Sequence, residues 1–576
     1  MMVKKTGSAA EVPMIACFGG GMPQKSHYIF VFRIPDMIPR MTTPQLPTRR
    51  SFLQQSSLLL AGLQFARAAE PDYVTADTSA GKVRGVIVDD IRIFKGIPYG
   101  ASTAGKNRFM PPVRPAKWSG VRDALAYGSS APQKGNANAA PNPNNPTQSE
   151  DCLVLNVYTP SLNGGSRRPV MMWLHGGGFS SGSGSGATIQ GANLAHSGDV
   201  VVVGINHRLG VLGQTYLGEA LGSGFAASGS VGVQDIVLAL DWVRENIAHF
   251  GGDPNQVTIF GQSGGGRKVA TLMAMPSAKG LFHRAIVESG AVLRLTTEED
   301  AIRTTNLLLA ELDLKPGQAR ELQNIPFEKL IAANDAVYQK LTMREPGMTE
   351  NSPMVDGKLI PGHPWDPAAP ALSAQIPLLI GWAHTEETAY DRPTAEKLAL
   401  DEAGLRDRVS KRLGVGDPNP VIAAYRASNP QSTPWDIYIL IATDHPRGAY
   451  SRELAKRKVV QGGAPAYVYR FDWETPEGGG HMRSPHAVEV PFVFENIKVA
   501  GQLISKRPDA FALSEKIAAA WVSFARTGNP NVPVLPRWPA YSADKRDTML
   551  FNNDSRVEQD PDRAARTAME TVLKLA

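Results

Sequence analysis

The chain has 576 residues, of which 42% are hydrophobic and 20% are charged. This balance is typical of a folded globular protein and argues against a mainly disordered one. The formal net charge is +6, but eight of the 60 Lys and Arg residues and only two of the 54 Asp and Glu residues lie within positions 1–68. The remainder is formally neutral, so the composition favours no nucleic-acid partner.

The N-terminal segment predicts an exported protein. The stretch "RRSFLQQSSLLLAGLQFARA" has paired arginines, a short apolar run and small residues at its end, Ala68. That order is typical of a cleaved signal peptide, and the paired arginines resemble a twin-arginine address. We predict a signal peptide over 41–68, cleavage after Ala68, and a periplasmic or secreted mature protein. Residues 1–40 fit no part of this pattern and are predicted to be a mis-called extension upstream of Met41.

An N-terminal membrane anchor is the alternative interpretation of this segment. Its apolar run is too short to span a bilayer comfortably, and we expect no later segment to do so, so no stable membrane anchor is predicted. The two cysteines are Cys17 and Cys152, and loss of the leader leaves Cys152 alone. A lone thiol excludes a disulfide-scaffold fold. We expect residues 69–576 to form a single domain.

Short strands open the mature chain. Residues 73–100 are expected to form strands separated by turns at Gly81 and at Asp89-Asp90. The stretch "KGNANAAPNPNNPT", Lys134–Thr147, predicts a solvated loop, because Asn, Pro and Gly favour turns and irregular backbone.

Buried strands and helices then alternate. Apolar spacing predicts a helix over 233–250 that ends at Gly251-Gly252. Apolar runs predict strands at 169–174, 199–206, 257–260, 377–382 and 466–473. The segments 297–373 and 391–456 are helix-like. This alternation predicts an α/β fold with one mainly parallel sheet that is interrupted by helical insertions.

The stretch "GQSGGGRK", beginning at Gly261, follows the strand at 257–260 and is compatible with two chemistries. A phosphate-binding loop needs Gly, four residues, Gly, then Lys and a hydroxyl residue. Gly261 and Gly266 have that spacing, but Arg267 comes next. Lys268 is one position late, and no hydroxyl residue follows it, so the pattern disfavours a phosphate site.

The second chemistry is nucleophilic attack by Ser263 in a Gly-x-Ser-x-Gly turn. A sharp strand-to-helix turn exposes the serine hydroxyl, and the helix N-terminus places N–H groups near developing negative charge. The pentapeptide alone also fits a plain glycine-rich turn. A second feature favours catalysis: His175-Gly176-Gly177-Gly178 follows a buried strand upstream, and successive glycines can turn their N–H groups inward to form an oxyanion hole.

With these motifs in place, the chain resembles the type-B carboxylesterases, the cholinesterase-like branch of the α/β-hydrolases, and within them the bacterial para-nitrobenzyl-esterase-like proteins. The resemblance extends from about Val74 to Tyr541. It rests on "FKGIPYG", "SEDCLVLNVYTP", "INHRLGVLG", "FGGDPNQVTIFGQSGGG", "LFHRAIVESG" and "WPAY" in this order. It implies an α/β-hydrolase fold, with a mostly parallel central sheet flanked by helices, and a serine carboxylesterase that uses neither a metal nor an organic cofactor.

The resemblance also implies a catalytic triad in the order Ser, acid, His. The nucleophile falls on Ser263. The acid falls on Glu386 in "GWAHTEETAY", with the adjacent Glu387 as the alternative. The base falls on His486 in "HAVEVPFVF", with His481 as its rival.

Further assignments concern the substrate. The oxyanion hole is expected from Gly177, Gly178 and Gly264, and Phe179 is expected to line the acyl side. The residue before the nucleophile is usually Glu in the family, and here it is Gln262. Loss of that carboxylate weakens attraction for cations, so we expect a small uncharged ester as substrate rather than a choline ester.

Two other departures from the family concern Lys268 and Cys152. Lys268 stands where the family often has Ser, and the sequence offers no account of it. The family disulfide that would join Cys152 is absent because Ala131 occupies the partner position, so the Lys134–Thr147 loop is expected to move over the active-site mouth. A lipase or polyester hydrolase, and a non-catalytic cholinesterase-like binding protein, are the alternative functions. No oligomeric state is indicated.

Overall fold

The computed structural model describes residues 71–135, 147–162, 165, 167–344, 351–502 and 504–575. The predicted N-terminal extension and signal peptide lie outside these residues, as does most of the predicted Lys134–Thr147 loop. The described residues belong to one compact unit that begins at position 70.

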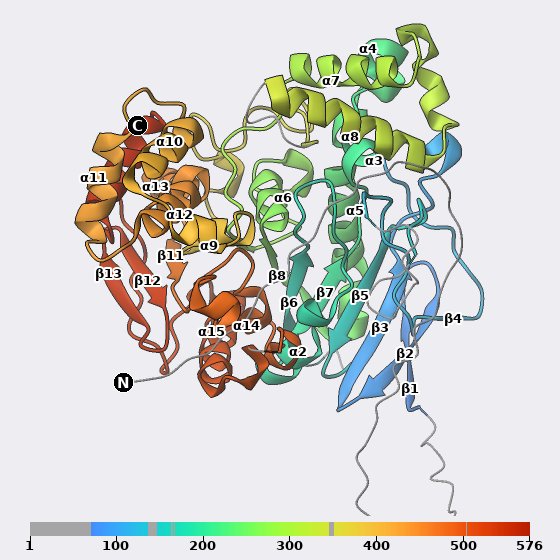
Figure 1. Cartoon of the computed structure of the whole chain (residues 1–576). Helices are drawn as coiled ribbons and strands as arrows, with labels where there is room; N and C mark the ends of the chain where they lie inside the picture. The colour runs from blue at the N-terminus through green and yellow to red at the C-terminus, as the bar shows by residue number, and fades with distance from the viewer. Residues whose placement is uncertain are drawn as a thin grey trace, which may run out of the picture. The chain divides into compact units, whose positions relative to one another are not determined.

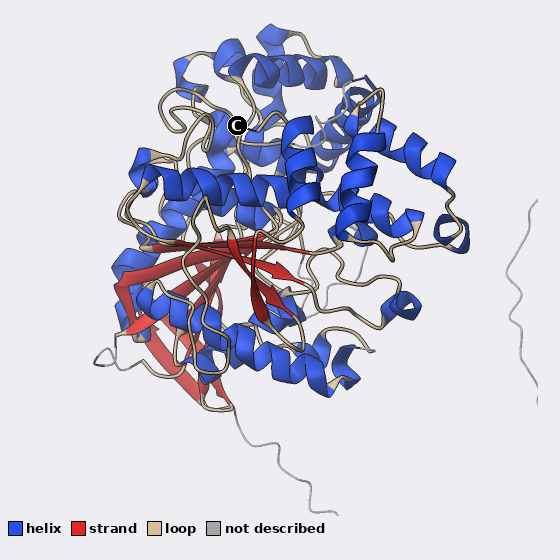
Figure 2. Cartoon of the chain, turned by 90° about the vertical axis from the view of Figure 1, so that its left-hand side faces the viewer, coloured by secondary structure: helices blue, strands red, loops and turns tan. Residues whose placement is uncertain are grey.

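A single twisted sheet runs through this unit (Figures 1 and 2). Its strands are β1 (Tyr73–Asp77), β2 (Lys82–Val88), β3 (Ile91–Pro98), β4 (Val121–Asp123), β5 (Val154–Thr159), β6 (Arg168–Leu174), β7 (Val201–Ile205), β8 (Gly252–Gln262), β9 (Arg284–Glu288), β10 (Leu378–Ala383), β11 (Ala466–Phe471), β12 (Asp547–Phe551) and β13 (Arg556–Gln559). The spatial order is β1-β2-β3-β5-β7-β6-β8-β9-β10-β11-β12-β13, and β4 pairs with β2.

The sheet is parallel from β7 to β12 and antiparallel at both ends. All five strands predicted from apolar runs are present, and each of β6, β7, β10 and β11 is almost entirely buried. The predicted N-terminal turns are confirmed, and Asp89 and Asp90 both have positive φ between β2 and β3. The mainly parallel α/β sheet expected from the alternation is therefore confirmed.

Helices cover both faces of the sheet (Figure 2). The α-helices are α2 (Ala192–Gly198), α3 (Gly210–Gln214), α4 (Gly218–Leu221), α5 (Val231–Asn246), α6 (Gly264–Leu272), α7 (Glu298–Glu311), α8 (Phe327–Arg344), α9 (Ala395–Leu398), α10 (Glu402–Leu413), α11 (Asn419–Ser428), α12 (Pro434–Thr443), α13 (Ala449–Gln461), α14 (Val490–Val493), α15 (Pro508–Thr527) and α16 (Arg563–Val572).

Helix α5 and its flanking turns correct one expectation. The segment Ser223–Phe250 is, by length and composition, long and apolar enough to cross a membrane, although no later span was predicted. In the structure, 61% of its apolar window is buried inside the protein. Ile236, Leu240 and Val243 belong to the main hydrophobic core. The apolar character of this helix is therefore accounted for by packing beneath the sheet.

Two helical insertions follow the carboxyl ends of strands β9 and β10. Helices α7 and α8 pack around a satellite core that includes Leu308, Leu330 and Val337, and α10–α12 pack with α16 around another. The predicted helical segment 391–456 is thus confirmed. The segment 297–373 is helical only in its first part, because residues 351–370 are rich in Pro and Gly and form turns and bends.

Candidate active site

Ser263 occupies a strained turn between strand β8 and helix α6. Its backbone has φ 57° and ψ −122°, a conformation that residues other than glycine rarely adopt. The Ser263 N–H donates to the Glu288 carbonyl at 2.7 Å, and the Arg267 N–H donates to the Ser263 carbonyl at 3.0 Å. These bonds hold the turn on both sides, as expected for a nucleophile elbow.

The glycines around Ser263 are required because strand β6 passes close by. A Cβ on Gly261 would lie 2.5 Å from the Leu174 carbonyl oxygen, and a Cβ on Gly265 would lie 2.9 Å from the Leu174 carbonyl carbon. Both distances are shorter than Cβ atoms tolerate. The two glycines of the Gly-x-Ser-x-Gly pattern are therefore required because the end of β6, where the glycine loop begins, packs directly against this turn.

The three glycines expected to form the oxyanion hole lie beside Ser263: Gly177 and Gly178 line the same cavity, and Gly264 is the next residue in the chain. Gly177 and Gly178 have φ of 85° and 62°, a left-handed conformation that glycine adopts without steric cost. Gly264 is the first residue of α6, and a Cβ there would lie 2.5 Å from the Gly178 carbonyl carbon. Within the described part of the chain, no hydrogen bond uses the N–H groups of these three glycines. They are available to an oxyanion.

Glu386 and His486 form a direct pair. Glu386 Oε2 lies 2.6 Å from His486 Nδ1, and Glu386 Oε1 accepts from the Ala383 N–H at 3.0 Å. Burial would raise the pKa of the fully buried Glu386 carboxyl. The charge and hydrogen bond of His486, together with the charge of Arg447, outweigh burial and hold that pKa below its usual value. Glu386 is therefore ionised at neutral pH.

The structure separates the two glutamates that the sequence left open. Glu387 points to two guanidinium groups, Arg447 Nη1 at 3.0 Å and Arg412 Nη1 at 3.2 Å. His481 is exposed, whereas His486 lines the same cavity as Ser263. The arrangement brings Ser263, Glu386 and His486 together and places Glu387 and His481 elsewhere.

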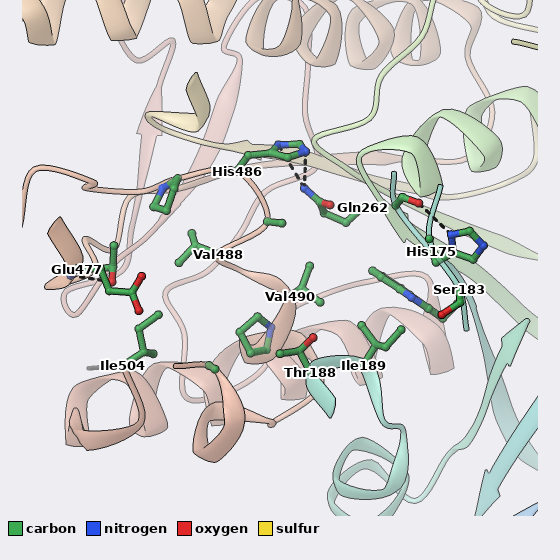
Figure 3. Close-up of a pocket in the computed structure, with 18 residues that line it drawn as sticks. His175, Ser183, Thr188, Ile189, Gln262, Glu477, His486, Val488, Val490 and Ile504 are labelled. Atoms are coloured by element: carbon green, nitrogen blue, oxygen red, sulfur yellow. Dashed lines mark hydrogen bonds between the residues drawn. The ribbon is translucent and has the colours of Figure 1, made fainter. Parts of the chain in front are cut away.

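Gln262 lies across the face of the His486 ring. Its Nε2 is 3.2 Å from His486 Nε2 and 3.4 Å from His486 Nδ1 (Figure 3). An in-plane hydrogen bond to one ring nitrogen would leave the other roughly 5 Å away. The near-equal distances therefore place the amide over the ring, rather than in the ring plane beside either nitrogen.

Changing Gln262 to Glu should move the acid limb of the pH–rate profile for kcat/KM upward by roughly one pH unit. A carboxylate against the ring stabilises the protonated imidazolium, and the unprotonated base is then reached only at higher pH. Initial rates on an uncharged ester between pH 5 and 9 measure this. Gln375→Glu adds the same charge at an exposed position and should leave the limb in place. An unmoved limb in Gln262→Glu would contradict the assigned contact.

Two cavities, each of about 400 Å³, meet at Gln262 and His486. The serine cavity also contains Ser263 and the glycine loop. The second cavity, which we call the Trp173 cavity because Trp173 lines it, has an apolar wall that includes Ile189, Val488 and Val490 (Figure 3). Together they can hold an ester on both sides of its carbonyl. Among the described residues, no group of three His, Cys, Asp or Glu side chains is placed to bind a metal ion.

Phe179 is not in the wall of either cavity. Its side chain is 1% exposed and belongs to the main hydrophobic core. The expectation that it lines the acyl side is not met in this structure, because the chain turns at Gly178 and directs the ring inward. The Ser/Gly run after it does reach a cavity, through Gly182 and Ser183.

Lys268, which the sequence could not explain, is fully buried behind the glycine loop. Its ammonium group donates to the His175 carbonyl at 2.8 Å and lies 5.9 Å from the centre of the Phe179 ring. Burial, and secondarily the charge of Lys268, lower the pKa of His175 and of the stacked His207 well below the usual value. His175 is therefore neutral and structural, and Lys268 anchors the start of the glycine loop.

Two buried carboxyl groups near Glu386, those of Glu288 and Glu489, were missed by sequence reasoning. Ser289 donates to Glu489 Oε1 at 3.2 Å, and Glu288 Oε1 accepts from Trp521 Nε1 at 2.7 Å. Burial raises the pKa of Glu288 to about 7. Burial and the charges of Glu288 and Glu386 raise the pKa of Glu489 well above its usual value. The sequence does contain a signal for them, because both glutamates lie inside motifs that carry the family resemblance, "VESG" and "HAVEVPF".

Glu288→Gln should make stability less dependent on pH. Because the pKa of Glu288 is raised by folding from 4.5 to about 7, the folded state holds more protons than the unfolded state, and stability falls as pH rises through this window. Between pH 5 and pH 8, the free energy of unfolding of the variant should increase relative to that of wild type by on the order of 2–3 kcal/mol. Thermal unfolding at both pH values tests this. Glu328→Gln, at an exposed position, is the control, and equal pH dependence in all three proteins would contradict the assignment.

Comparison with known proteins shows extended similarity. The sequence model of the carboxylesterase family matches residues 72–569. The para-nitrobenzyl esterase of Bacillus subtilis is 37% identical over 500 residues, which cover 84% of this chain and 96% of the relative. The phenmedipham hydrolase of Pseudarthrobacter oxydans is 33% identical over 511 residues, covering 86% and 99%.

Solved structures show the same similarity. A carboxylesterase of Geobacillus stearothermophilus superposes with a TM-score of 0.74 at 36% identity, covering 85% of this chain and 99% of that chain. An esterase of Clostridium hathewayi, described as able to hydrolyse aliphatic aromatic polyesters, superposes with a TM-score of 0.73 at 33% identity, covering 87% and 98%. These structures and the sheet order agree on the α/β-hydrolase fold.

Proposed function

Because this chain belongs to the carboxylesterase family and is a carboxylic-ester hydrolase, we propose that it acts through an acyl-enzyme formed on Ser263, with His486 as base and Glu386 as its orienting acid. The observation that carries the proposal is the convergence of three separate segments at one cavity. Ser263 and His486 both line it, and the 2.6 Å contact ties His486 to Glu386.

The chemistry follows from these positions. His486 Nε2 accepts the proton of the Ser263 hydroxyl as its oxygen attacks the ester carbonyl. The ionised Glu386 holds the proton on Nδ1 and stabilises the imidazolium that forms. His486 then protonates the leaving alcohol. Water repeats the sequence on the acyl-enzyme and releases the acid.

The N–H groups of Gly177, Gly178 and Gly264 stabilise the oxyanion in both steps. They are held in place before substrate binds, so little reorganisation accompanies the development of charge. Lys268 supports this arrangement from behind by fixing the His175 carbonyl. The glycine loop therefore acts together with the triad in lowering the barrier.

Gln262 bears on the choice of substrate. With an amide rather than a carboxylate against His486, the site has no negative charge at this position to attract a cationic alcohol. We propose that uncharged esters, not choline esters, are hydrolysed. A polyester-hydrolase activity is the second candidate, and the similarity to the Clostridium hathewayi esterase favours it. Activity that rises only above the solubility limit of a substrate would support that second function.

Fluorophosphonate labelling tests the nucleophile. Wild-type protein should take up one label, on the peptide that contains Ser263, and Ser263→Ala should take up none. Ser289→Ala is the matched control, because Ser289 is a second serine of the same cavity, and this variant should still be labelled. An unlabelled wild type would refute the enzyme, and equal labelling of Ser263→Ala would refute the nucleophile. Labelling that depends on Ser263 would exclude the non-catalytic alternative, and absence of labelling in wild type would support it.

We also propose that residues 41–68 direct export by the twin-arginine route and are then removed. The support is the order of charged, apolar and small residues in that segment. Expression from Met41 in hosts with and without the twin-arginine translocase should give an exported protein only in the former, with Ala69 at its N-terminus. An N-terminal sequence that begins upstream of Ala69 would refute this cleavage site.

A further inference from the structure

The segment between helices α12 and α13 reaches the catalytic acid. The two helices are separated by a π-helical turn, Asp444–Gly448, in which His445 leaves helical geometry at φ −93° and ψ 100°. Turns of this kind interrupt helices frequently at functional positions. Here the turn places Arg447 in the wall of the serine cavity, together with His486. The helical insertion therefore contributes a charged side chain to the site.

Side chains hold this turn from two sides. Asp444 accepts a hydrogen bond from the Tyr425 hydroxyl at 2.6 Å and pairs with Arg452 at 2.9 Å. On the other side, the Arg412 guanidinium donates to the His445 carbonyl at 3.0 Å. Because these partners come from separate helices, the backbone that carries Arg447 is fixed by the packing of the insertion.

Arg447 contacts three side chains around the triad. Its Nε lies 3.4 Å from Glu386 Oε2, and its Nη1 lies 3.0 Å from Glu387 Oε2. Its guanidinium carbon lies 4.7 Å from the centre of the Tyr390 ring, and that ring centre lies 5.3 Å from the centre of the His486 ring. Ion pairs on one side and an aromatic ring on the other fix the orientation of the guanidinium.

The atom of Glu386 that Arg447 contacts is the one that holds the base. Glu386 Oε2 lies 2.6 Å from His486 Nδ1, whereas Oε1 accepts from the Ala383 N–H. The guanidinium and the imidazole therefore share one carboxylate oxygen. A positive charge at this point opposes the second positive charge that forms when His486 accepts a proton.

The charge of Arg447 is permanent. Burial would lower the pKa of Arg447, but the charges of Glu386 and Glu387 outweigh burial and hold that pKa above its usual value. Arg447 is therefore positively charged at every pH at which the protein is folded and active. Its influence on His486 does not depend on its own titration.

Other ionisable groups also surround the Glu386–His486 pair. They are Glu387, Glu288, Glu489, Arg267, Tyr390, His175 and Glu477. Burial raises the pKa of Glu288 and of Glu489, which favours their neutral forms. The observation that distinguishes Arg447 is its contact with the carboxylate oxygen that His486 uses.

We propose that Arg447 is a positioning residue of the esterase, which holds Glu386 against His486 and keeps His486 in its proton-accepting form at lower pH than the Glu386–His486 pair alone would allow. The inference rests on the proposed function at Ser263, because it concerns the base of that reaction. The helical insertion thereby sets the lower end of the pH range in which esters are hydrolysed.

The pH dependence of kcat/KM for an uncharged ester tests this role. In Arg447→Gln the acid limb should move upward by roughly one pH unit, because the imidazolium is no longer opposed by a nearby cation. Arg447→Lys retains the charge and should keep the limb close to its wild-type position. A role in packing alone would lower the rate at every pH in both variants and leave the limb where it is.

Arg412→Gln is the matched comparison, because Arg412 belongs to the same cluster but pairs with Glu387. It should move the limb much less than Arg447→Gln does, and Arg537→Gln, at an exposed position, should not move it. Arg447→Met, which keeps an unbranched side chain against Tyr390, replaces the glutamine variant if that variant does not fold.

Three results would overturn this inference and leave the proposed function standing, provided that wild type shows Ser263-dependent hydrolysis. They are an unmoved limb in the neutral Arg447 variants, an equal movement in Arg412→Gln, and an equal movement in Arg447→Lys. Absence of Ser263-dependent hydrolysis in wild type would overturn both the inference and the proposed function.

Discussion

Glu386→Gln should lower kcat roughly 10⁴-fold on any ester. The amide can present its NH₂ to His486 Nδ1, which favours the tautomer with the proton on Nε2, and that tautomer cannot accept the proton of Ser263. It also removes the negative charge that stabilises the imidazolium. Burst kinetics with a p-nitrophenyl ester would measure acylation directly.

Glu387→Gln provides a matched control, since it is the same substitution one residue along. Glu387 contacts Arg412 and Arg447 rather than His486, so its loss should cost far less, within roughly tenfold. The alternative assignment from the sequence predicts the reverse order. If Glu387→Gln were the more damaging change, the acid would have to be reassigned.

Gly264→Ala should lower kcat by roughly 10²–10³-fold, even though the family usually has alanine at this position. A Cβ there would lie 2.5 Å from the Gly178 carbonyl carbon, so the glycine loop must move away from Ser263. Loss of one preorganised oxyanion donor has an effect of about this size. Affinity for a trifluoromethyl ketone, which forms a tetrahedral adduct, should fall in parallel with kcat.

Gly224→Ala is the control for this substitution, because a Cβ at Gly224 would meet nothing within 4 Å. It should leave activity unchanged. Full activity in Gly264→Ala would show that the loop accommodates the methyl group, and the close approach of Gly178 to Gly264 would then have no catalytic importance.

The nucleophile turn was predictable because its determinants are local. An apolar β strand, glycines at fixed spacing and an apolar helix are adjacent in the sequence, and the steric demand acts over a few residues. The same holds for the five predicted strands, whose continuous apolar runs indicate burial on both faces. The resemblance to the carboxylesterases then supplied His486 and the two candidate acids.

The choice between Glu386 and Glu387 was different in kind. Both are acidic, adjacent and mostly buried, and nothing in the local pattern shows which one turns to His486. Phe179 is a similar case, because its place after the glycine loop suggested contact with substrate, and the backbone turn directs it to the core. Side-chain direction after a turn depends on the surrounding packing.

Charge around the nucleophile depends on distant parts of the chain even more strongly. Arg267, on helix α6, and Arg447, between α12 and α13, are 180 positions apart in the numbering, yet the fold places both of them in the wall of the serine cavity. Local patterns encode backbone conformation and burial, since these act between neighbours in the chain. Which charged groups become partners depends on which distant segments the fold packs together and shields from water.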